Sequence, residues 1–496
     1  MICIVAEKPS TARDIAGTLG EQPKKHDGYL SVGPYVVTWA FGHLVTLAAP
    51  EVYNPTWKRW DWATLPMIPD QFQLVPVPKT QGQLKIIHRL MRQADTVICA
   101  TDGDREGELI FRYIYRLADV QKPVDRLWLS ETTPTAIQQA LHHMKPLAAY
   151  DALAHAAEAR AQADWLVGLN ATRSITLQHG QAGHGALSVG RVQTPTLALI
   201  ADREAAIAQF QPQAYWTVDV TFETATGATY AARWMPFSPA EISSPDREEH
   251  PERLTEDAAR SFVQRLPRGT RGRIIQVHRQ TVTVNPPLLF SLNDLQKEAN
   301  KRLGLTAQQT LDVAQSLYEK HLTSYPRTES RYITQEIATT IPDRLAALPP
   351  TYAAWAQSAT ATAPNRLIND AKVAAAGHYA IIPTPNQGDK PALSDREQNV
   401  YDLIVRRFIA ALWPAGQDER TICWTGADGE TFRTQGSTVV MAGWRTVYAS
   451  LSETKSEGDE KDNPMTVPAG LQAQDPVTLA AIEEAWTYVN KMDTRN

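Results

Sequence analysis

Short apolar runs alternate with helical patterns through the first 145 residues of the chain. The first run spans residues 2–6, and Pro9 and Ser10 suit the first turn of a helix that continues through Leu19. A second run, residues 96–100, precedes an acidic loop and another helical pattern. Strands that alternate with helices favour a mostly parallel α/β sheet with helices on both faces.

Acidic side chains follow both of these predicted strands. Glu7 follows the first strand and Asp102 the second, so both carboxylates can converge beyond the carboxyl ends of the strands, where ligands of such sheets bind. Asp102, Asp104 and Glu106 are two residues apart, which turns their side chains to one side of an extended loop. Such oxygen ligands fit Mg²⁺ better than zinc. The alternative is a solvated acidic loop.

Each of two basic side chains near these acids could have either a functional or a purely structural role. Lys8, beside Glu7, could neutralise a phosphate oxygen or be a solvated lysine at a helix start. His43, in the loop after an expected strand at residues 38–41, could contact a phosphate or simply be an ordered loop residue.

The bulk properties exclude some classes of protein. A chain of 496 residues is expected to form several domains, and its net charge of −5 argues against indiscriminate nucleic-acid binding, although a basic groove can coexist with acidic faces. Its three cysteines form no C-x-x-C pair, so neither a zinc ribbon nor a disulfide framework is indicated. We find no signal peptide and no apolar stretch of membrane-spanning length, and we expect a cytoplasmic protein without a membrane association.

Alanine-rich helices and then strands follow the predicted sheet. Residues 147–208 read as helical, with Arg160 and Asp164 on one helical face and a loop at 187–192 in which Gly190 permits close approach of a ligand. From residue 209 the pattern alternates as in strands, and strands return at 421–424, 431–434 and 438–441. Residues 236–251 read as a polar surface loop.

A helical insertion separates these two groups of strands. It holds expected helices at 291–303 and, after a capping box at Thr306, at 307–319, which resemble a winged-helix arrangement. Tyr325-Pro326-Arg327 follows. The proline pushes Tyr325 to an extended conformation, and the planar guanidinium of Arg327 suits a phosphate. A phenol beside a guanidinium could attack a phosphodiester, or it could be a buried tyrosine near a surface arginine. His378, farther along the chain, could contact a phosphate or could be a structural histidine in the core or at the surface.

Five segments in order carry a family resemblance: EKPSTA, ATDGDREGE, LSVGRVQTPTLALI, LTSYPRTESRY and HYAIIPT. The first two resemble the Toprim domain. Together the five resemble the type IA DNA topoisomerases, and EKPSTA and YPRT resemble the topoisomerase III branch. The resemblance implies a multidomain toroid with a Rossmann-like Toprim domain, a helical domain, a β arch and an inserted winged-helix-like domain. The boundaries we expect are 1–146 (Toprim), 147–208 (helical), 209–284 and 391–465 (arch), 285–390 (insertion) and 466–496 (the start of a returning helical domain, cut short).

The resemblance also implies roles for single residues. Those expected at the reaction centre are Tyr325 as the nucleophile, Arg327 and Lys8 as phosphate contacts, and Glu7 as the acid/base residue. Those expected to bind Mg²⁺ are Glu7, Asp102, Asp104 and Glu106. Those expected to bind DNA are Arg160, Ser188, Arg191, Gln193, His378 and His43.

The implied reaction cuts one DNA strand through a transient 5′-phosphotyrosyl bond, passes a strand and religates it, relaxing negatively supercoiled DNA or decatenating DNA with single-stranded regions. Bond energy is kept in the phosphotyrosyl link, so ATP is not needed, and the chain contains no P-loop motif. The expected partner is single-stranded segments of duplex DNA, and a helicase partner is left open.

Three features depart from the family pattern. Gly103 stands where proline is usual, which predicts a less rigid acidic loop, and Glu329 replaces the commoner aspartate. After the acidic stretch 452–463 we expect only one helix, residues 476–491. Two rival classes remain: a Toprim primase or nuclease without a nucleophilic tyrosine, and a noncatalytic single-strand DNA-binding module.

Overall fold

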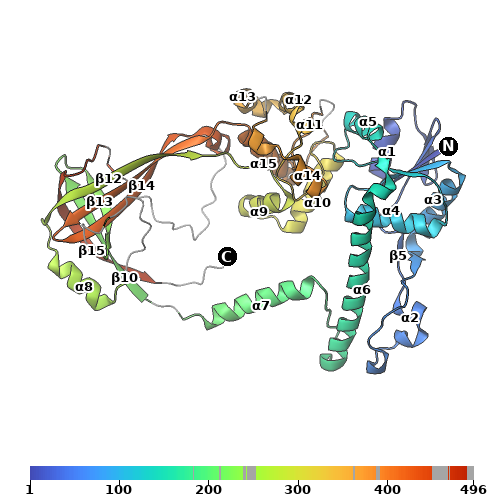
Figure 1. Ribbon diagram of the computed structural model, residues 1–496, viewed down its shortest axis with the longest axis horizontal. Coiled ribbons are helices and arrows are strands. Elements are labelled where there is room, and N and C mark those ends of the chain that lie inside the picture. The colour runs from blue at the N-terminus through green and yellow to red at the C-terminus, as the bar shows by residue number, and fades with distance from the viewer. Residues whose placement is uncertain are drawn as a thin grey trace. The chain divides into compact units, whose positions relative to one another are not determined.

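The structure is a computed structural model that describes residues 1–181, 184–211, 214–237, 242, 253–360, 363–386, 391–449, 467–468 and 470–488 (Figure 1). The chain divides into two compact units. Unit 1 comprises residues 1–198 and 287–412, and unit 2 comprises residues 199–286 and 413–496. The acidic stretch 452–463 lies outside the described residues, as does the predicted loop 236–251 except for residues 236, 237 and 242.

A seven-stranded sheet forms the N-terminal part of unit 1, in the order β2-β3-β4-β1-β7-β8-β9. The central pairs β4–β1, β1–β7 and β7–β8 are parallel, and the pairs at both edges are antiparallel. The predicted parallel sheet is therefore confirmed at its centre. The strands are β1 (Ile2–Ala6), β2 (Lys24–His26), β3 (Tyr29–Val32), β4 (Tyr35–Trp39), β7 (Thr96–Ala100), β8 (Val124–Arg126) and β9 (Lys145–Pro146).

Helices cover both faces of this sheet because alternate residues of β1 point to opposite sides. Cys3 and Val5 belong to a core with α3 (Gln81–Gln93) and α4 (Arg105–Ala118). Ile4 and Ala6 belong to a second core with α1 (Pro9–Gly17) and α5 (Pro134–His142). A small pair, β5 (Val45–Leu47) and β6 (Leu74–Pro76), and the short α2 (Pro50–Tyr53) complete this part.

The predicted helical region contains α6 (Asp151–His179) and α7 (Gln193–Gln209). Thr172 and Thr176 of α6 fix the loop before α7. The backbone N–H of Val189 donates to Thr172 Oγ1 at 2.9 Å, and that of Leu187 donates to Thr176 Oγ1 at 2.9 Å. The loop that carries the predicted DNA-binding residues is thus held on α6.

The insertion in unit 1 begins with the two predicted helices, which the structure confirms. Ser291 caps the first, and Thr306 forms a capping box with Gln309 at the second. Its helices are α9 (Leu292–Leu303), α10 (Ala307–Glu319), α11 (Gln335–Ala338), α12 (Ile341–Ala346), α13 (Ala353–Ser358), α14 (Asp370–Ala376) and α15 (Asp395–Ala411).

Unit 2 is a closed barrel in the order β10-β11-β14-β13-β12-β15. Phe222, Phe432 and Ile274 belong to its core, onto which α8 packs Phe262. The predicted strands of this region are confirmed, and the last two are one continuous strand, β14. The elements are β10 (Ala214–Thr224), β11 (Thr229–Met235), α8 (Glu256–Arg265), β12 (Arg271–Val284), β13 (Gly416–Ala427), β14 (Glu430–Met441) and β15 (Pro476–Tyr488).

The predicted helix at 476–491 is wrong, because residues 476–488 form strand β15. This strand pairs with β10 and β12 and so closes the barrel. Val477 and Leu479 are buried while Thr478 between them is exposed, which is the alternation of a strand. The alanines and glutamates of the segment favour a helix locally, but the two open strand edges override that preference.

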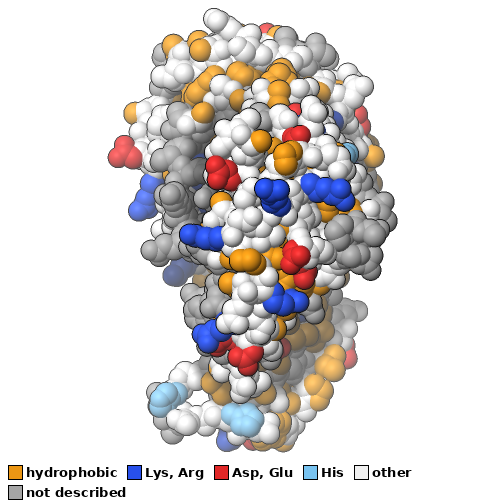
Figure 2. All heavy atoms as spheres, turned by 90° about the vertical axis from the view of Figure 1, so that its left-hand side faces the viewer, with side chains coloured by type: hydrophobic (Ala, Val, Ile, Leu, Met, Phe, Trp, Pro, Cys, Tyr) orange, Lys and Arg blue, Asp and Glu red, His pale blue; other side chains and the backbone are white. Residues whose placement is uncertain are grey.

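The expected end of the insertion at residue 390 would assign α15 to the same domain as the strands of unit 2. In the structure α15 packs against α9 and α10 in unit 1. The insertion therefore extends to residue 412. Among the described residues, charges of both signs are interspersed on the face seen in Figure 2, without a patch of one sign. Nowhere in the described part of the chain is a helix long and apolar enough to cross a bilayer.

Candidate active site

The acidic loop follows β7 and leads into α4. Asp104 is the N-cap of α4, where its Oδ1 accepts the backbone N–H of Gly107 at 2.7 Å. The N–H of Asp102 donates to Glu7 Oε2 at 3.1 Å, which joins the ends of β1 and β7. An added Cβ at Gly107 would lie 2.2 Å from Asp102 O, so only glycine permits this tight turn.

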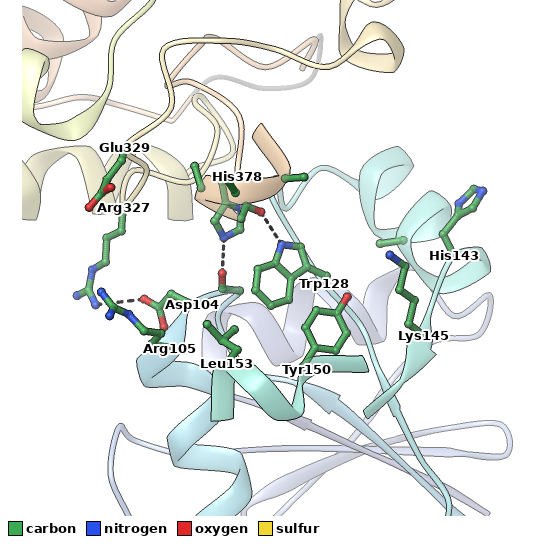
Figure 3. A pocket seen from close by; sticks show the side chains of 16 residues that line it. Asp104, Arg105, Trp128, His143, Lys145, Tyr150, Leu153, Arg327, Glu329 and His378 are labelled. Carbon is green, nitrogen blue, oxygen red and sulfur yellow. Dashed lines mark hydrogen bonds and ion pairs between the residues drawn. The ribbon is translucent and has the colours of Figure 1, made fainter. Parts of the chain in front are cut away.

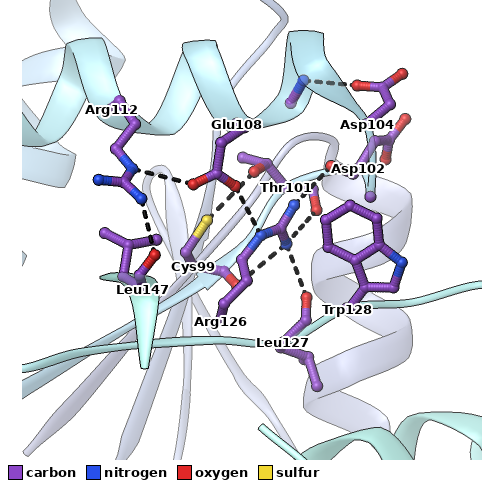
Figure 4. Close-up of polar contacts among 12 residues, drawn as sticks. Cys99, Thr101, Asp102, Asp104, Glu108, Arg112, Arg126, Leu127, Trp128 and Leu147 are labelled. Atoms are coloured by element: carbon purple, nitrogen blue, oxygen red, sulfur yellow. Dashed lines mark hydrogen bonds and ion pairs between the residues drawn. The ribbon is translucent and has the colours of Figure 1, made fainter. Parts of the chain in front are cut away.

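A buried arginine supports the loop from below (Figure 4). Arg126 Nη2 donates to Asp102 O at 2.7 Å, and Nη1 donates to Thr101 O at 2.8 Å. Its Nε donates to Glu108 Oε2 at 3.0 Å, and both of these side chains are fully buried. Because the charges of the pair compensate each other and their hydrogen bonds are satisfied, the backbone of the acidic loop is held firmly.

Tyr325 lies against this loop. Its backbone N–H donates to Ser130 O at 2.9 Å, and its Oη donates to Asp104 Oδ2 at 2.9 Å. The side chain is only 1% exposed, between the edge-on ring of Tyr318 and the ring of His378. The structure therefore brings the predicted nucleophile and the acidic loop into direct contact.

Two predicted cations lie beside the same acids. Arg327 Nη1 is 3.7 Å from Asp104 Oδ2. Lys8 Nζ is 3.5 Å from Asp102 Oδ2 and 3.1 Å from Glu319 Oε1 at the end of α10. Arg327 is exposed, so its guanidinium remains accessible to a phosphate.

The site concentrates negative charge in a buried place. Burial, followed by repulsion from Asp102 and Asp104, raises the pKa of Glu7 to about 8. Burial, followed by the charges of the same two aspartates, raises the pKa of Tyr325 well above its usual value of 10. Burial also raises the pKa of Asp102, although Lys8 opposes this shift. At neutral pH both Glu7 and Tyr325 therefore carry protons.

The carboxylates fit Mg²⁺ by donor type but give it few protein ligands. Glu7, Asp102 and Asp104 are brought together, whereas Glu106 turns to His43, whose Nε2 is 2.5 Å from Glu106 Oε1. Within the described residues no three His, Cys, Asp or Glu side chains form a group that could hold an ion. Mg²⁺ often binds through one or two carboxylates, water and substrate phosphate, and Asp102 and Asp104 can supply such a pair.

Four predicted DNA-binding residues form a separate group on α6, the loop before α7 and the first residue of α7. Arg191 Nε donates to Asp164 Oδ1 at 2.9 Å, and Arg160 Nε is 3.8 Å from Asp164 Oδ2. Gln193 Nε2 donates to Ser188 Oγ at 2.8 Å. No hydrogen bond or ion pair seen between described residues links this group to Tyr325.

His378 packs against Tyr325, and both of its ring nitrogens make hydrogen bonds. Its Nε2 is 2.6 Å from Gly103 O and its Nδ1 is 2.8 Å from Ser130 Oγ. Since a carbonyl oxygen can only accept, Nε2 carries the proton and Ser130 donates to Nδ1. Burial lowers the pKa of His378 to about 4, so the ring is neutral at pH 7. In this arrangement the histidine holds the acidic loop and the Tyr325 ring.

Gly103 is buried, and its carbonyl is held by His378, so the acidic loop is fixed rather than loose at this position. An added Cβ would lie 2.7 Å from His378 Cε1 and 2.9 Å from Trp128 Cε2. A proline would therefore not fit among the neighbours that this chain has.

Sequence reasoning missed the segment Trp128–Thr132, most of whose residues contact the insertion. Trp128 Nε1 donates to Gly377 O at 3.0 Å, Glu131 pairs with Arg344, and Thr132 Oγ1 donates to Tyr318 O at 3.2 Å. The segment follows β8, the parallel neighbour of β7. The rule that ligand sites lie beyond the carboxyl ends of parallel strands would have found it.

Comparison with known proteins agrees with this fold. The model of the DNA topoisomerase family matches residues 148–493, and that of the Toprim domain matches residues 2–132. The chain is 41% identical to DNA topoisomerase 3 of Shouchella clausii over 474 residues, covering 92% of this chain and 62% of that protein. It is 37% identical to DNA topoisomerase 3 of Bacillus subtilis over 488 residues, covering 97% of this chain and 64% of that protein.

Among solved structures, the chain resembles full-length topoisomerase I of Thermotoga maritima. The TM-score is 0.69 at 20% identity, and the match covers 99% of this chain and 72% of that one, which establishes a shared fold. A Toprim domain joined to the topoisomerase fold defines the class. The chain belongs to the DNA topoisomerase family, so the family predicted from the motifs is confirmed. It spans less than two thirds of the length of the two DNA topoisomerase 3 relatives.

Proposed function

We propose that the chain cleaves and religates one strand of DNA through a transient 5′-phosphotyrosyl bond at Tyr325. The observation that carries this proposal is the 2.9 Å hydrogen bond from Tyr325 Oη to Asp104 Oδ2, which joins the insertion to the acidic loop. Neither rival class of protein needs a buried tyrosine at this position.

The step balances with residues of this chain alone. Tyr325 Oη attacks the phosphorus and passes its proton to Asp104 Oδ2, which already accepts it as a hydrogen bond. The bond from phosphorus to the 3′ oxygen breaks, and that oxygen takes a proton from Glu7, which is protonated at neutral pH because its pKa is about 8. Arg327 and Lys8 stabilise the charge on the phosphate. Religation reverses these transfers, so no ATP is consumed.

Mg²⁺ is the metal we assign to Asp102 and Asp104, and when bound it would supply positive charge to the substrate phosphate. We assign single-strand binding to Arg160, Ser188, Arg191 and Gln193, and a phosphate-facing position to His43. Relaxation or decatenation, a cytoplasmic location and a helicase that exposes single strands are proposed on the strength of the relatives named DNA topoisomerase 3.

Trapping the covalent complex tests the proposal. We expect an adduct between the protein and a 3′-labelled single-stranded oligonucleotide on a denaturing gel, and we expect Tyr325→Phe to abolish it. Tyr318→Phe is the matched control, because Tyr318 is equally buried and its ring packs edge-on against Tyr325. An adduct that survives in Tyr325→Phe would contradict the assignment of Tyr325 as the nucleophile, and metal-dependent cleavage without any adduct would favour the nuclease class.

A further inference from the structure

A cavity of about 820 Å³ opens beside the reaction centre in unit 1 (Figure 3). Part of its wall comes from residues 103–105, Arg327 and Glu329. Other parts come from Trp128, from several residues between 140 and 153, and from residues 374–378 of the insertion. Its volume lies in the range of ligand-binding pockets. None of the roles assigned above uses the part of this cavity beyond Arg327.

Aromatic rings occupy the middle of the cavity. Tyr150 stacks on Trp128 with ring centroids 5.1 Å apart and planes 9° apart. Trp128 is fixed by its hydrogen bond to Gly377 O and by stacking on His378. Tyr150 is half-buried, and its hydroxyl makes no hydrogen bond to any described residue. A ring held in place without a structural hydrogen bond is a suitable platform for a nucleobase.

Basic side chains lie at both ends of these rings. Figure 3 shows Arg105 and Arg327 beside Asp104 at one end, and Lys145 and His143 at the other. Arg105 and Lys145 are exposed, and neither forms an ion pair within the described part of the chain. Because Glu329 also lines the cavity, its wall is not uniformly basic. We therefore expect phosphates to bind at the individual side chains of Arg105, Arg327 and Lys145.

We propose that this cavity binds the nucleotide next to the scissile phosphate, with its base on Tyr150 and its far phosphate at Lys145. The inference rests on the proposed function and adds the location of the strand beyond the reaction centre. The scissile phosphate lies at Arg327 and Arg105, and the aromatic rings occupy the interval in which the adjoining base must lie.

Binding of a labelled oligonucleotide, measured by fluorescence anisotropy in the uncleaving Tyr325→Phe background, tests the proposal. We expect Tyr150→Leu to weaken binding about fivefold or more, because base stacking is lost. Tyr150→Phe should bind as tightly as the parent, since the hydroxyl has no partner. Lys145→Ala should reduce the slope of log K against log salt by about 0.7, the contribution of one phosphate contact to a single strand.

Lys25→Ala is the matched control for the lysine. Lys25 and Lys145 are both exposed and lie on β2 and β9, the opposite edge strands of one sheet. The control should keep both the affinity and the salt slope of the parent. A series of oligonucleotides, each with one abasic site at a different position, locates the stacked base. One position should weaken binding to the parent protein, and an abasic site at that position should not weaken binding to Tyr150→Leu any further.

The proposal is overturned if Tyr150→Leu and Lys145→Ala bind DNA as tightly as Lys25→Ala. It is also overturned if Tyr150→Phe binds DNA as weakly as Tyr150→Leu, or if no abasic position abolishes the effect of Tyr150→Leu on binding. These measurements need no covalent chemistry. Their failure would leave the adduct at Tyr325 intact, and failure of the adduct would leave these binding results unaffected.

Discussion

Glu7 and Glu131 both lie where the N-terminal sheet meets the insertion, but their surroundings are opposite. Glu131 is 5% exposed, and its Oε1 lies 2.7 Å from Arg344 Nη1 and 2.5 Å from Tyr379 Oη. Glu7 accepts one backbone hydrogen bond and faces Asp102 and Asp104, which together with burial raise its pKa to about 8. One end of the interface is closed by a buried ion pair, whereas Glu7 at the other end faces two carboxylates and forms no ion pair with a described residue.

The difference assigns separate tasks to the two ends. A compensated buried pair such as Glu131–Arg344 holds two parts of the fold together. Burial of Glu7 and its repulsion by Asp102 and Asp104 cost stability, which is typical of sites that bind a metal or transfer protons. Separation of the two parts while Tyr325 holds a DNA end would have to break the first set of contacts.

The largest expected effect concerns the compensated end. Arg344→Met should lower the free energy of unfolding by about 3–5 kcal/mol, because it leaves the Glu131 charge buried and unpaired. Equilibrium urea unfolding measures the loss. Arg331→Met is the control, since Arg331 is half-exposed and 3.8 Å from Asp294, and it should cost less than about 1 kcal/mol.

A double variant sharpens this result. Glu131→Gln combined with Arg344→Met removes both charges, so it should be more stable than the sum of the two single losses predicts. Additive losses would contradict a direct pairing between these two side chains.

Gly103→Ala should have an intermediate effect at the catalytic end. The new Cβ would displace His378 or Trp128, which we expect to cost about 1–3 kcal/mol and to reduce adduct formation. Gly82→Ala in α3 is the control. A Cβ there meets no atom within 4 Å, so helix propensity should raise stability by up to about 1 kcal/mol. Equal stability changes in the two variants would refute the close packing around Gly103.

The smallest expected effect follows from the pKa of Glu7. Folding raises this pKa from 4.5 to about 8, so ionisation of Glu7 disfavours the folded state. The protonated side chain therefore leaves the protein more stable at low pH, and this stability is lost as the pH rises through about 8. In EDTA at pH 9, Glu7→Gln should therefore be more stable than the parent by at least about 1.4 kcal/mol, the equivalent of one pKa unit.

Thermal unfolding between pH 5 and pH 9 measures this difference, which should disappear toward pH 5. Mg²⁺ added at pH 9 should stabilise the parent, because a cation offsets the repulsion among the acids. Glu51→Gln, at an exposed glutamate, should follow the parent at every pH. A parent and a Glu7→Gln variant with parallel pH profiles would show that the charges around Glu7 are compensated after all.

The sequence predicted the parts of the site that depend on local patterns. Glu7 and Asp102 are adjacent because parallel strand ends meet at one edge, and this follows from the two apolar runs before them. The contact between Ser130 and His378 joins residues 248 positions apart, and no local pattern indicates it. The segment 476–488 was misread as a helix because its pairing partners lie in β10 and β12, far away in the chain.

The most direct test of the account is to locate the DNA on the protein by mass spectrometry. Trypsin should cleave after Lys320 and Arg327 and release residues 321–327, in which Tyr325 is the only tyrosine. After trapping and nuclease trimming, we predict a nucleotide phosphate on this peptide, with fragmentation assigning it to Tyr325. Attachment to Thr323 or Ser324, or to a peptide that lacks Tyr325, would contradict the account.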